Sequence, residues 1–197
     1  MDINYRPAEK DDSSRIAELI NIASDGVVEH LFHDLVPEMT PVQIMTHNLE
    51  QDNYPHSNQS ASVAADGPDV IGMALSYPSS YHKITGEMRN FFPKDRLEHL
   101  SDFYSSCVAD SWFLDALGVY ATYRKKGIGT RLVELTKDKA KENGYEILSL
   151  IAFADNSTAL GLYKALGFHV VQKVHLEGNE FIPHQEGCLL LKCDLSA

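Results

Sequence analysis

YRKKGIGTRL, residues 123–132, joins a predicted strand to a predicted helix through a glycine turn. The apolar run from Trp112 to Tyr120 precedes it and reads as a central strand, because apolar residues occupy both of its faces. Residues 127–142 follow with helical spacing, so a glycine turn joins a strand to a helix. The first N–H groups of a helix lack intrahelical partners and lie at the positive end of the helix dipole. The turn is therefore predicted to bind an anion such as phosphate.

Basic residues strengthen the prediction of a phosphate site at this turn. Arg124, Lys125 and Lys126 lie directly before its two glycines, and a hydrogen bond to a charged group contributes roughly 1.5–3 kcal/mol. The stretch is not a Walker loop, which needs GxxxxGK followed by Ser or Thr. It is not a dinucleotide fingerprint either, because that motif needs a small residue where Leu132 stands. If only the loop is considered, a helix that starts with glycines and binds no phosphate is an equally good interpretation.

The composition is that of an ordinary globular protein. The chain has 197 residues, of which 44% are hydrophobic and 23% are charged, and this length suits one domain with a sizeable core. No apolar run approaches the ~20 residues of a membrane span, and the N-terminus lacks the pattern of a secretory signal. Three cysteines without CxxC spacing argue against a disulfide framework or a zinc site. We therefore expect a cytoplasmic protein with no membrane partner.

The charge of the chain is strongly acidic and unevenly spread. A net charge of -11 argues against nucleic acid as a partner. Residues 1–60 hold 11 acidic and 3 basic side chains, whereas residues 61–197 hold 17 and 14. A solvated face explains this imbalance, and so does a surface that attracts a cationic substrate.

Hydrophobic periodicity predicts strands and helices that alternate along the chain. Strands are predicted at 3–6, 61–65, 69–77, 111–120, 146–153, 168–176 and 187–195. Helices are predicted from about residue 12, and at 27–36, 41–51, 127–142 and 156–166. The segment at about 78–110 reads as an insertion, with helical spacing over 96–107. This order of elements predicts an α/β fold with helices on the faces of a mixed sheet.

Two motifs together resemble the signature of the Gcn5-related N-acetyltransferase (GNAT) family. The first is LGVYATYRKKGIG, residues 117–129, and the second is NSTALGLYKALGF, residues 156–168. They occur in the family's order and at its usual separation, and YRPA at residues 5–8 leads into a first helix. The resemblance implies the GNAT fold, a mixed, mainly antiparallel central sheet that is flanked by helices and splayed in the middle. It implies a single GNAT domain over residues 1–197, with an insertion at about 78–110.

The resemblance also implies how the co-substrate acetyl-CoA is held. Its pyrophosphate would lie against the loop, mostly on the backbone N–H groups of Arg124, Lys125, Lys126, Gly127, Ile128, Gly129 and Thr130. The pantetheine arm would pair with the preceding strand at Leu117 and Val119, and Gly118 between them fits a β-bulge. Asn156 matches a residue that bonds the pantetheine arm, with a helix N-cap as the other interpretation. No metal is implied.

Tyr163 matches the family's usual general acid. The reaction is attack of a neutral amine on a thioester through a tetrahedral intermediate, with a thiolate leaving. Because a phenol has a pKa of about 10 and a thiol a pKa of about 8.5, full proton transfer is uphill by roughly 2 kcal/mol in water. Either the site reduces this difference in pKa between the phenol and the thiol, or Tyr163 only donates a hydrogen bond to the charge that develops on the sulfur. A core tyrosine on an amphipathic helix is the alternative.

Asp115 is the candidate general base, because a carboxylate inside an otherwise apolar strand is costly without a partner. The diamine acetyltransferases of the family resemble the chain here, with Glu at the matching position. The alternatives are an aspartate that bonds nearby backbone, and deprotonation relayed by water. One helix face also carries four residues that suggest a metal site, although a solvated face or a contact to the amine explains them better: Glu29, His30, His33 and Asp34.

The sequence therefore predicts an N-acetyltransferase that moves the acetyl group of acetyl-CoA to a primary amine by direct attack in a ternary complex. The acceptor would be a small cationic amine, a polyamine or a peptide amine. The alternatives are a non-catalytic acyl-CoA sensor and a transferase for a larger acyl group. Dimers are common in the family, so a homodimer is a further expectation.

Overall fold

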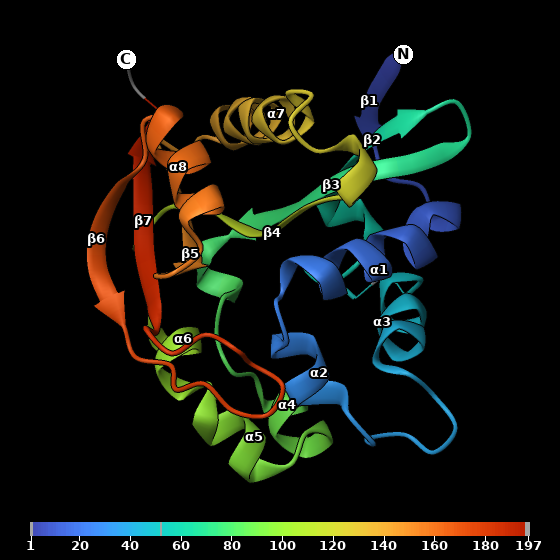
Figure 1. Cartoon of the computed structure of the whole chain (residues 1–197), viewed down its shortest axis with the longest axis vertical. Helices are drawn as coiled ribbons and strands as arrows, with labels where there is room; N and C mark the ends of the chain where they lie inside the picture. The colour runs from blue at the N-terminus through green and yellow to red at the C-terminus, as the bar shows by residue number, and fades with distance from the viewer. Residues whose placement is uncertain (1, 52, 196–197) are drawn as a thin grey trace. The chain divides into compact units, whose positions relative to one another are not determined.

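Strands and helices alternate along the chain, as the hydrophobic pattern predicts. The computed structural model describes residues 2–51 and 53–195. Its strands are β1 (Ile3–Pro7), β2 (Ala61–Asp66), β3 (Asp69–Pro78), β4 (Trp112–Val119), β5 (Ile147–Phe153), β6 (His169–Val174) and β7 (Cys188–Asp194). Its α-helices, drawn in Figure 1, are α1 (Ser13–Ala23), α2 (Val27–Phe32), α3 (Pro41–Leu49), α4 (Gly86–Phe91), α5 (Lys94–His99), α6 (Ser101–Ser105), α7 (Ile128–Glu142) and α8 (Ser157–Ala165).

The sheet is mixed and mainly antiparallel. Its strand order is β1-β2-β3-β4-β5-β7-β6. β1 pairs with β2, β2 with β3, β5 with β7, and β6 with β7, all in antiparallel register. β4 pairs with β5 in parallel, through Trp112–Leu114 and Leu148–Leu150. The predicted fold class, an α/β fold with a mixed sheet flanked by helices, is therefore confirmed.

The residues divide into two compact units. Unit 1 holds the residues up to Tyr77 together with Asp115–Asp138, and unit 2 holds Pro78–Leu114 together with the residues from Lys139 onward. The segment expected as an insertion is thus the first part of unit 2. A single domain over residues 1–197 stays a prediction.

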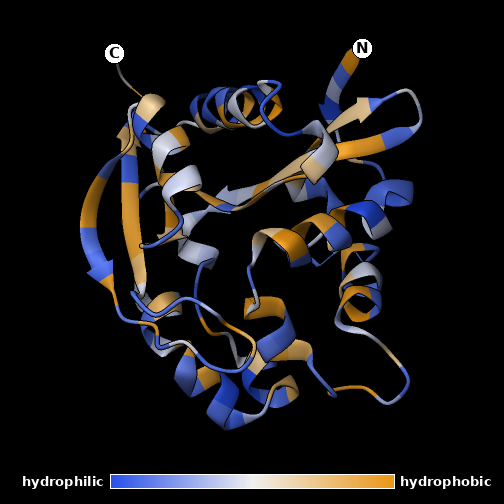
Figure 2. Ribbon diagram, viewed as in Figure 1, coloured by the Kyte–Doolittle hydropathy of each residue, from blue (hydrophilic) through white to orange (hydrophobic). Residues whose placement is uncertain are grey.

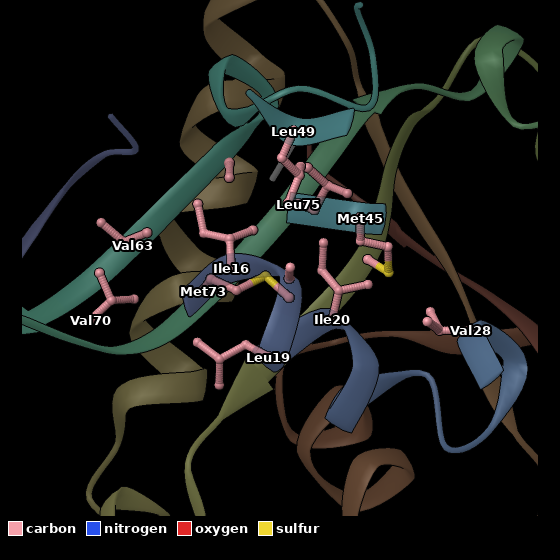
Figure 3. Close-up of a cluster of buried hydrophobic side chains, with 12 residues drawn as sticks. Ile16, Leu19, Ile20, Val28, Met45, Leu49, Val63, Val70, Met73 and Leu75 are labelled. Carbon is pink, nitrogen blue, oxygen red and sulfur yellow. The ribbon is translucent and has the colours of Figure 1, made fainter. Parts of the chain in front are cut away.

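The core of unit 1 lies between α1, α3 and the hairpin of β2 and β3. Figure 3 shows Ile16, Leu19 and Ile20 of α1 in one cluster with Met73 and Leu75 of β3. The three helix residues recur at the spacing of one helical face, which is why the sequence predicts this packing. Burying each such side chain contributes about 1.5–3 kcal/mol, so this cluster fixes α1 against the sheet.

The second and third helices of unit 1 are shorter than predicted. The helix expected at 27–36 ends at Phe32, because His33 takes a non-helical ψ of 129° and Asp34 a φ of 48°, which a right-handed helix does not allow. α3 likewise ends two residues before its expected boundary. Its start is defined by a capping box, in which the Thr40 hydroxyl accepts the N–H of Gln43 at 3.2 Å and the Gln43 side chain accepts that of Thr40 at 2.8 Å.

In unit 2, β7 lies between β5 and β6 (Figure 1). The helix predicted over 96–107 is instead two short helices, α5 and α6, which meet at Leu100. α4 was not predicted, because its six residues are too few to show a hydrophobic period; the Thr85 hydroxyl caps it by accepting the N–H of Met88 at 3.2 Å. Gly167, with a φ of 87°, follows the end of α8, as expected for a helix stop.

The hydropathy of β7 and of α7 agrees with the surroundings of each element. Figure 2 shows hydrophobic colour along much of β7, which has a neighbouring strand on each side, and mixed colours along the amphipathic helix α7. Within residues 2–51 and 53–195, no helix has both the length and the apolar character needed to span a membrane.

Candidate active site

The loop between β4 and α7 presents a row of unused backbone donors. The first helical hydrogen bond of α7 runs from the Arg131 N–H to the Gly127 carbonyl, at 3.0 Å. Within the described part of the chain, the N–H groups of Lys125 to Thr130 donate to no backbone carbonyl. Lys125 and Gly127 have positive φ angles of 60° and 81°. Successive N–H groups in such a turn form a concave anion site at the start of a helix.

The side chains of this loop are exposed and partly held in place. The Arg124 Nε donates to the Val119 carbonyl at 3.0 Å, and the Lys126 Nζ lies 5.1 Å from the centre of the Tyr123 ring. Arg124, Lys125 and Lys126 are all exposed, so their charges add to the donors of the backbone. The positive φ of Lys125 was not predicted, because glycine is the residue that sequence patterns associate with that conformation.

Gly118 lets α1 approach β4 closely. A Cβ atom at this position would lie 2.7 Å from the carbonyl oxygen of Leu19 and 3.1 Å from its Cβ. No larger residue fits here without a shift of the α1 backbone. The expected β-bulge at Gly118 stays a prediction, whereas the close approach gives this glycine a structural reason. Leu117 and Val119, the expected pantetheine contacts, flank it on β4.

Tyr120 connects the end of β4 to α1 and to the loop. Its hydroxyl donates to Glu18 Oε2 at 2.5 Å, and Arg15 also contacts that oxygen, at 3.1 Å. Its N–H donates to the Ile71 carbonyl at 3.1 Å, and its carbonyl accepts the N–H of Tyr123 at 2.8 Å. Partial burial, and then the Glu18 carboxylate, raise the pKa of Tyr120 to about 12. The hydrogen bond from Tyr120 is also the main reason why the pKa of Glu18 is lowered.

Asp115 accepts a hydrogen bond from a buried tyrosine and, among the described residues, from no backbone group. The Tyr77 hydroxyl on β3 donates to Asp115 Oδ1 on β4 at 2.8 Å. Tyr77 is 1% exposed, whereas Asp115 is half-buried. The ring of His56 packs edge-on against Tyr77, with 5.5 Å between ring centres. The carboxyl group in this apolar strand therefore has a neutral hydrogen-bond donor as its partner.

Asn156 is the N-cap of α8 in unit 2. Its Oδ1 accepts the N–H of Ala159 at 3.1 Å, so the capping interpretation of this residue is confirmed. Its side-chain NH₂ group donates to no other group in the described residues, and the residue is half-buried. Capping and a contact to a ligand are thus compatible, because they use different atoms of one amide.

Tyr163 lies on α8 and is 8% exposed. Its ring contacts that of Phe168, with 5.6 Å between ring centres. Burial raises the pKa of Tyr163 above that of an ordinary phenol, so its hydroxyl keeps its proton more firmly than in water. This shift increases the difference between the pKa of Tyr163 and that of a thiol. It therefore favours donation of a hydrogen bond to a thiolate over complete transfer of the proton.

A histidine and an aspartate meet near the N-cap of α8. His184 Nδ1 lies 2.5 Å from Asp155 Oδ1, and the His184 ring stacks on Phe153 at 3.8 Å between centres. Burial, and then the Asp155 charge, raise the pKa of Cys188 to about 12, so this thiol is protonated at neutral pH. The contact holds the segment between β6 and β7 to the end of β5.

The expected site residues fall in both units. Asp115, the two pantetheine contacts on β4 and the loop residues Arg124 to Thr130 belong to unit 1, and Asn156 and Tyr163 belong to unit 2. Within the described ranges, no group of three or more His, Cys, Asp and Glu side chains is arranged to hold a metal ion. Within the part of the chain that the structure describes, Cys107, Cys188 and Cys193 form no disulfide bond.

Comparison with known proteins identifies the family. The model of the acetyltransferase (GNAT) family matches residues 28–168, which is more than half of the chain. The chain therefore belongs to this family of acetyltransferases. An acetyltransferase crystal structure covers 98% of this chain and 100% of its own, with a TM-score of 0.70 at 23% identity, and this likeness shows the same fold.

The curated relatives match over shorter segments. An uncharacterized N-acetyltransferase of Bacillus subtilis is 36% identical over 56 residues, which are 28% of this chain and 36% of that protein. An aminoglycoside N(6')-acetyltransferase type 1 of Acinetobacter genomosp. 13 is 34% identical over 79 residues, which are 40% of this chain and 52% of that protein. The chain thus spans about a third to a half of the length of these relatives.

The hydrogen-bond partners of Asp115 and Tyr120 could not be predicted from the sequence. Tyr77 is 38 positions from Asp115, and Glu18 is 102 positions from Tyr120. Neither pair leaves a local pattern, because each is formed by the packing of separate elements. The one signal in the sequence was the cost of burying Asp115 without a partner, which required that some donor face it.

Proposed function

We propose that this chain transfers the acetyl group of acetyl-CoA to a primary amine. The observation that carries the proposal is the row of unused N–H donors from Lys125 to Thr130, at the start of α7 and beside three exposed basic side chains. This arrangement suits a diphosphate, which offers several acceptor oxygens and negative charge. Membership of a family of acetyltransferases supports the assignment of that diphosphate to coenzyme A.

The proposed reaction is direct attack within a ternary complex. The neutral amine nitrogen forms a bond to the thioester carbonyl carbon, the nitrogen then loses its second proton to solvent, and the C–S bond breaks as the tetrahedral intermediate collapses to the amide and the thiolate. Asp115, directly or through water, takes the proton that the ammonium group loses. Tyr163 donates a hydrogen bond to the sulfur as negative charge develops there, and its raised pKa supports this role over complete proton transfer.

The proposed acceptor is a cationic amine. Eleven acidic and three basic side chains among residues 1–60 support this preference, because negative potential raises the local concentration of a cation. The similarity to an aminoglycoside acetyltransferase agrees with an amine-bearing small molecule. The preference predicts that polycationic amines react faster than neutral amines at low salt, and equal rates would contradict it.

Calorimetric titration with acetyl-CoA, free CoA and ATP tests the proposed co-substrate. We expect micromolar binding of acetyl-CoA and of CoA, and weak binding of ATP, because the loop is proposed to hold CoA together with its pantetheine arm. If neither CoA species binds, the loop does not hold this ligand and the proposed activity is wrong.

A measurement of turnover then distinguishes an acetyltransferase from a non-catalytic acyl-CoA sensor. Release of free thiol is followed with acetyl-, propionyl- and succinyl-CoA against a panel of amines. A sensor module would bind acetyl-CoA without consuming it, whereas a transferase for a larger acyl group would prefer one of the other donors. We expect turnover to be fastest with acetyl-CoA.

A further inference from the structure

We propose that Tyr77 is a positioning residue for the carboxylate of Asp115. The inference rests on the proposed function, because it adds a residue to the machinery that removes a proton from the amine. Tyr77 is 38 residues away in the sequence and belongs to neither family motif. Its hydroxyl reaches from β3 to Asp115 Oδ1 on the neighbouring strand β4, at a distance of 2.8 Å.

The burial of the two residues differs in a way that suits this role. Tyr77 is 1% exposed, so its hydroxyl must find a partner inside the protein. Asp115 is half-buried and therefore keeps access to solvent and to a ligand. Within the described residues, Asp115 Oδ1 accepts this one side-chain hydrogen bond and Oδ2 accepts none. Tyr77 thus fixes one oxygen of the carboxylate and leaves the other oxygen available to accept a proton.

A tyrosine suits this position better than a cationic donor. An arginine or lysine beside Asp115 would neutralise the carboxylate and weaken it as a base. A phenol donates a single neutral hydrogen bond, which limits rotation of the carboxylate without adding a positive charge beside it. A general base must lie within hydrogen-bond distance of the proton that it removes, and a fixed carboxylate meets that condition more often than a rotating one.

The edge-on contact with His56 fixes the tyrosine in turn. Its ring centre lies 5.5 Å from that of Tyr77, with an angle of 69° between the planes. This contact and the strand backbone define the direction of the hydroxyl group, since only two side-chain torsions determine the position of a Tyr ring. Tyr77→Phe keeps the ring contact and removes only the donor, which makes it the informative change.

The test is a double-mutant cycle of Tyr77→Phe and Asp115→Asn. We expect Tyr77→Phe to lower kcat about 10-fold, a part of the ~10²-fold that loss of a general base costs. The Kd of acetyl-CoA, measured by calorimetry, should stay within about twofold, because the loop donors are unchanged. In the Asp115→Asn background, Tyr77→Phe should lower kcat no further, since coupled residues are not additive.

A purely structural role would give a different pattern. Tyr145→Phe is the matched control, because it also removes one hydroxyl group, and within the described residues that group makes no hydrogen bond. We expect it to leave kcat unchanged. Loss of the same factor from kcat in both Asp115 backgrounds would show that Tyr77 acts by another route and would overturn the inference, as would a kcat of wild-type size for Tyr77→Phe.

The cycle also separates this inference from the proposed activity. If Asp115→Asn keeps the wild-type kcat, Asp115 is not the base and the role of Tyr77 is wrong, yet acetyl transfer is then directly demonstrated. If wild-type protein binds no CoA in the calorimetric titration, the activity itself is wrong. We expect Tyr77→Phe to stay folded in the assay, because phenylalanine has nearly the same shape as tyrosine. A melting temperature above the assay temperature checks this.

Discussion

Replacing Tyr120 by phenylalanine removes one hydroxyl group from the junction of β4 with the loop. That hydroxyl donates to Glu18 Oε2 at 2.5 Å. A hydrogen bond to a charged group contributes roughly 1.5–3 kcal/mol. The pKa of Tyr120 is raised from 10.0 to about 12, which corresponds to ~2.7 kcal/mol at full strength. Because Tyr120 keeps much contact with solvent, screening reduces that figure, and we expect Tyr120→Phe to lower the free energy of unfolding by about 1 kcal/mol.

The pH dependence gives this prediction its direction. The folded state raises the pKa of Tyr120, so the contribution is fully present below pH 10 and is lost as the pH rises toward about 12. The pKa of Glu18 is lowered in the folded state, so its share of the contribution is lost in acid, as the carboxylate takes up a proton. The stability difference between wild type and Tyr120→Phe should therefore be largest near neutral pH and should shrink on both sides.

Urea denaturation of both proteins at pH 4, 7 and 11 measures that difference. Arg15→Gln is the control, because Arg15 contacts the same Glu18 oxygen at 3.1 Å from an exposed position. Such a surface pair contributes about 0–1 kcal/mol, so its loss should cost less than the loss of the Tyr120 hydroxyl. A difference of under ~0.3 kcal/mol at pH 7 for Tyr120→Phe, or one as large at pH 11 as at pH 7, would refute the reasoning.

Two further substitutions test the chemistry and the packing of the site. Tyr163→Phe should lower turnover by about 10²-fold while acetyl-CoA still binds; steady-state kinetics with calorimetry measures both, and unchanged turnover would remove Tyr163 from the role. Gly118→Ala should lower the free energy of unfolding by about 1–3 kcal/mol, because its Cβ would lie 2.7 Å from the Leu19 carbonyl oxygen. The matched control is Gly161→Ala, where no atom outside the local helix backbone lies within 4 Å of the added Cβ; equal urea midpoints for the two alanine variants would contradict the packing argument.

The elements that surround the loop could be predicted because each has a local signal. β4 is apolar on both faces, α7 has a helical period, and Gly127 stands where the backbone takes a φ of 81°. Each of these signals depends on residues within about one turn or one strand length. The same reasoning fails at Lys125, whose φ of 60° is imposed by the turn against the preference of its own side chain.

The contacts of the site residues could not be predicted, for a reason that is also physical. A buried carboxylate indicates that a donor is present, but it does not indicate which one. Tyr77 reads in the sequence as one more apolar residue of β3, a strand with eight consecutive buried positions. Only the placement of β3 beside β4 gives its hydroxyl a partner. Prediction from the sequence thus selects Asp115 as a candidate but does not identify the residues around it.

The two tyrosine–carboxylate pairs have a common consequence for β4. Tyr77 bonds Asp115 near the middle of the strand, and Tyr120 bonds Glu18 directly after its end. Between these two anchors lies Gly118, held against the Leu19 carbonyl. The segment 115–120 is therefore fixed at each end by a hydrogen bond from a phenol, which is a neutral donor. The two pairs use different partners, so their contributions to the free energy of unfolding should add within about 0.5 kcal/mol, whereas only the Tyr77 pair should affect kcat through Asp115.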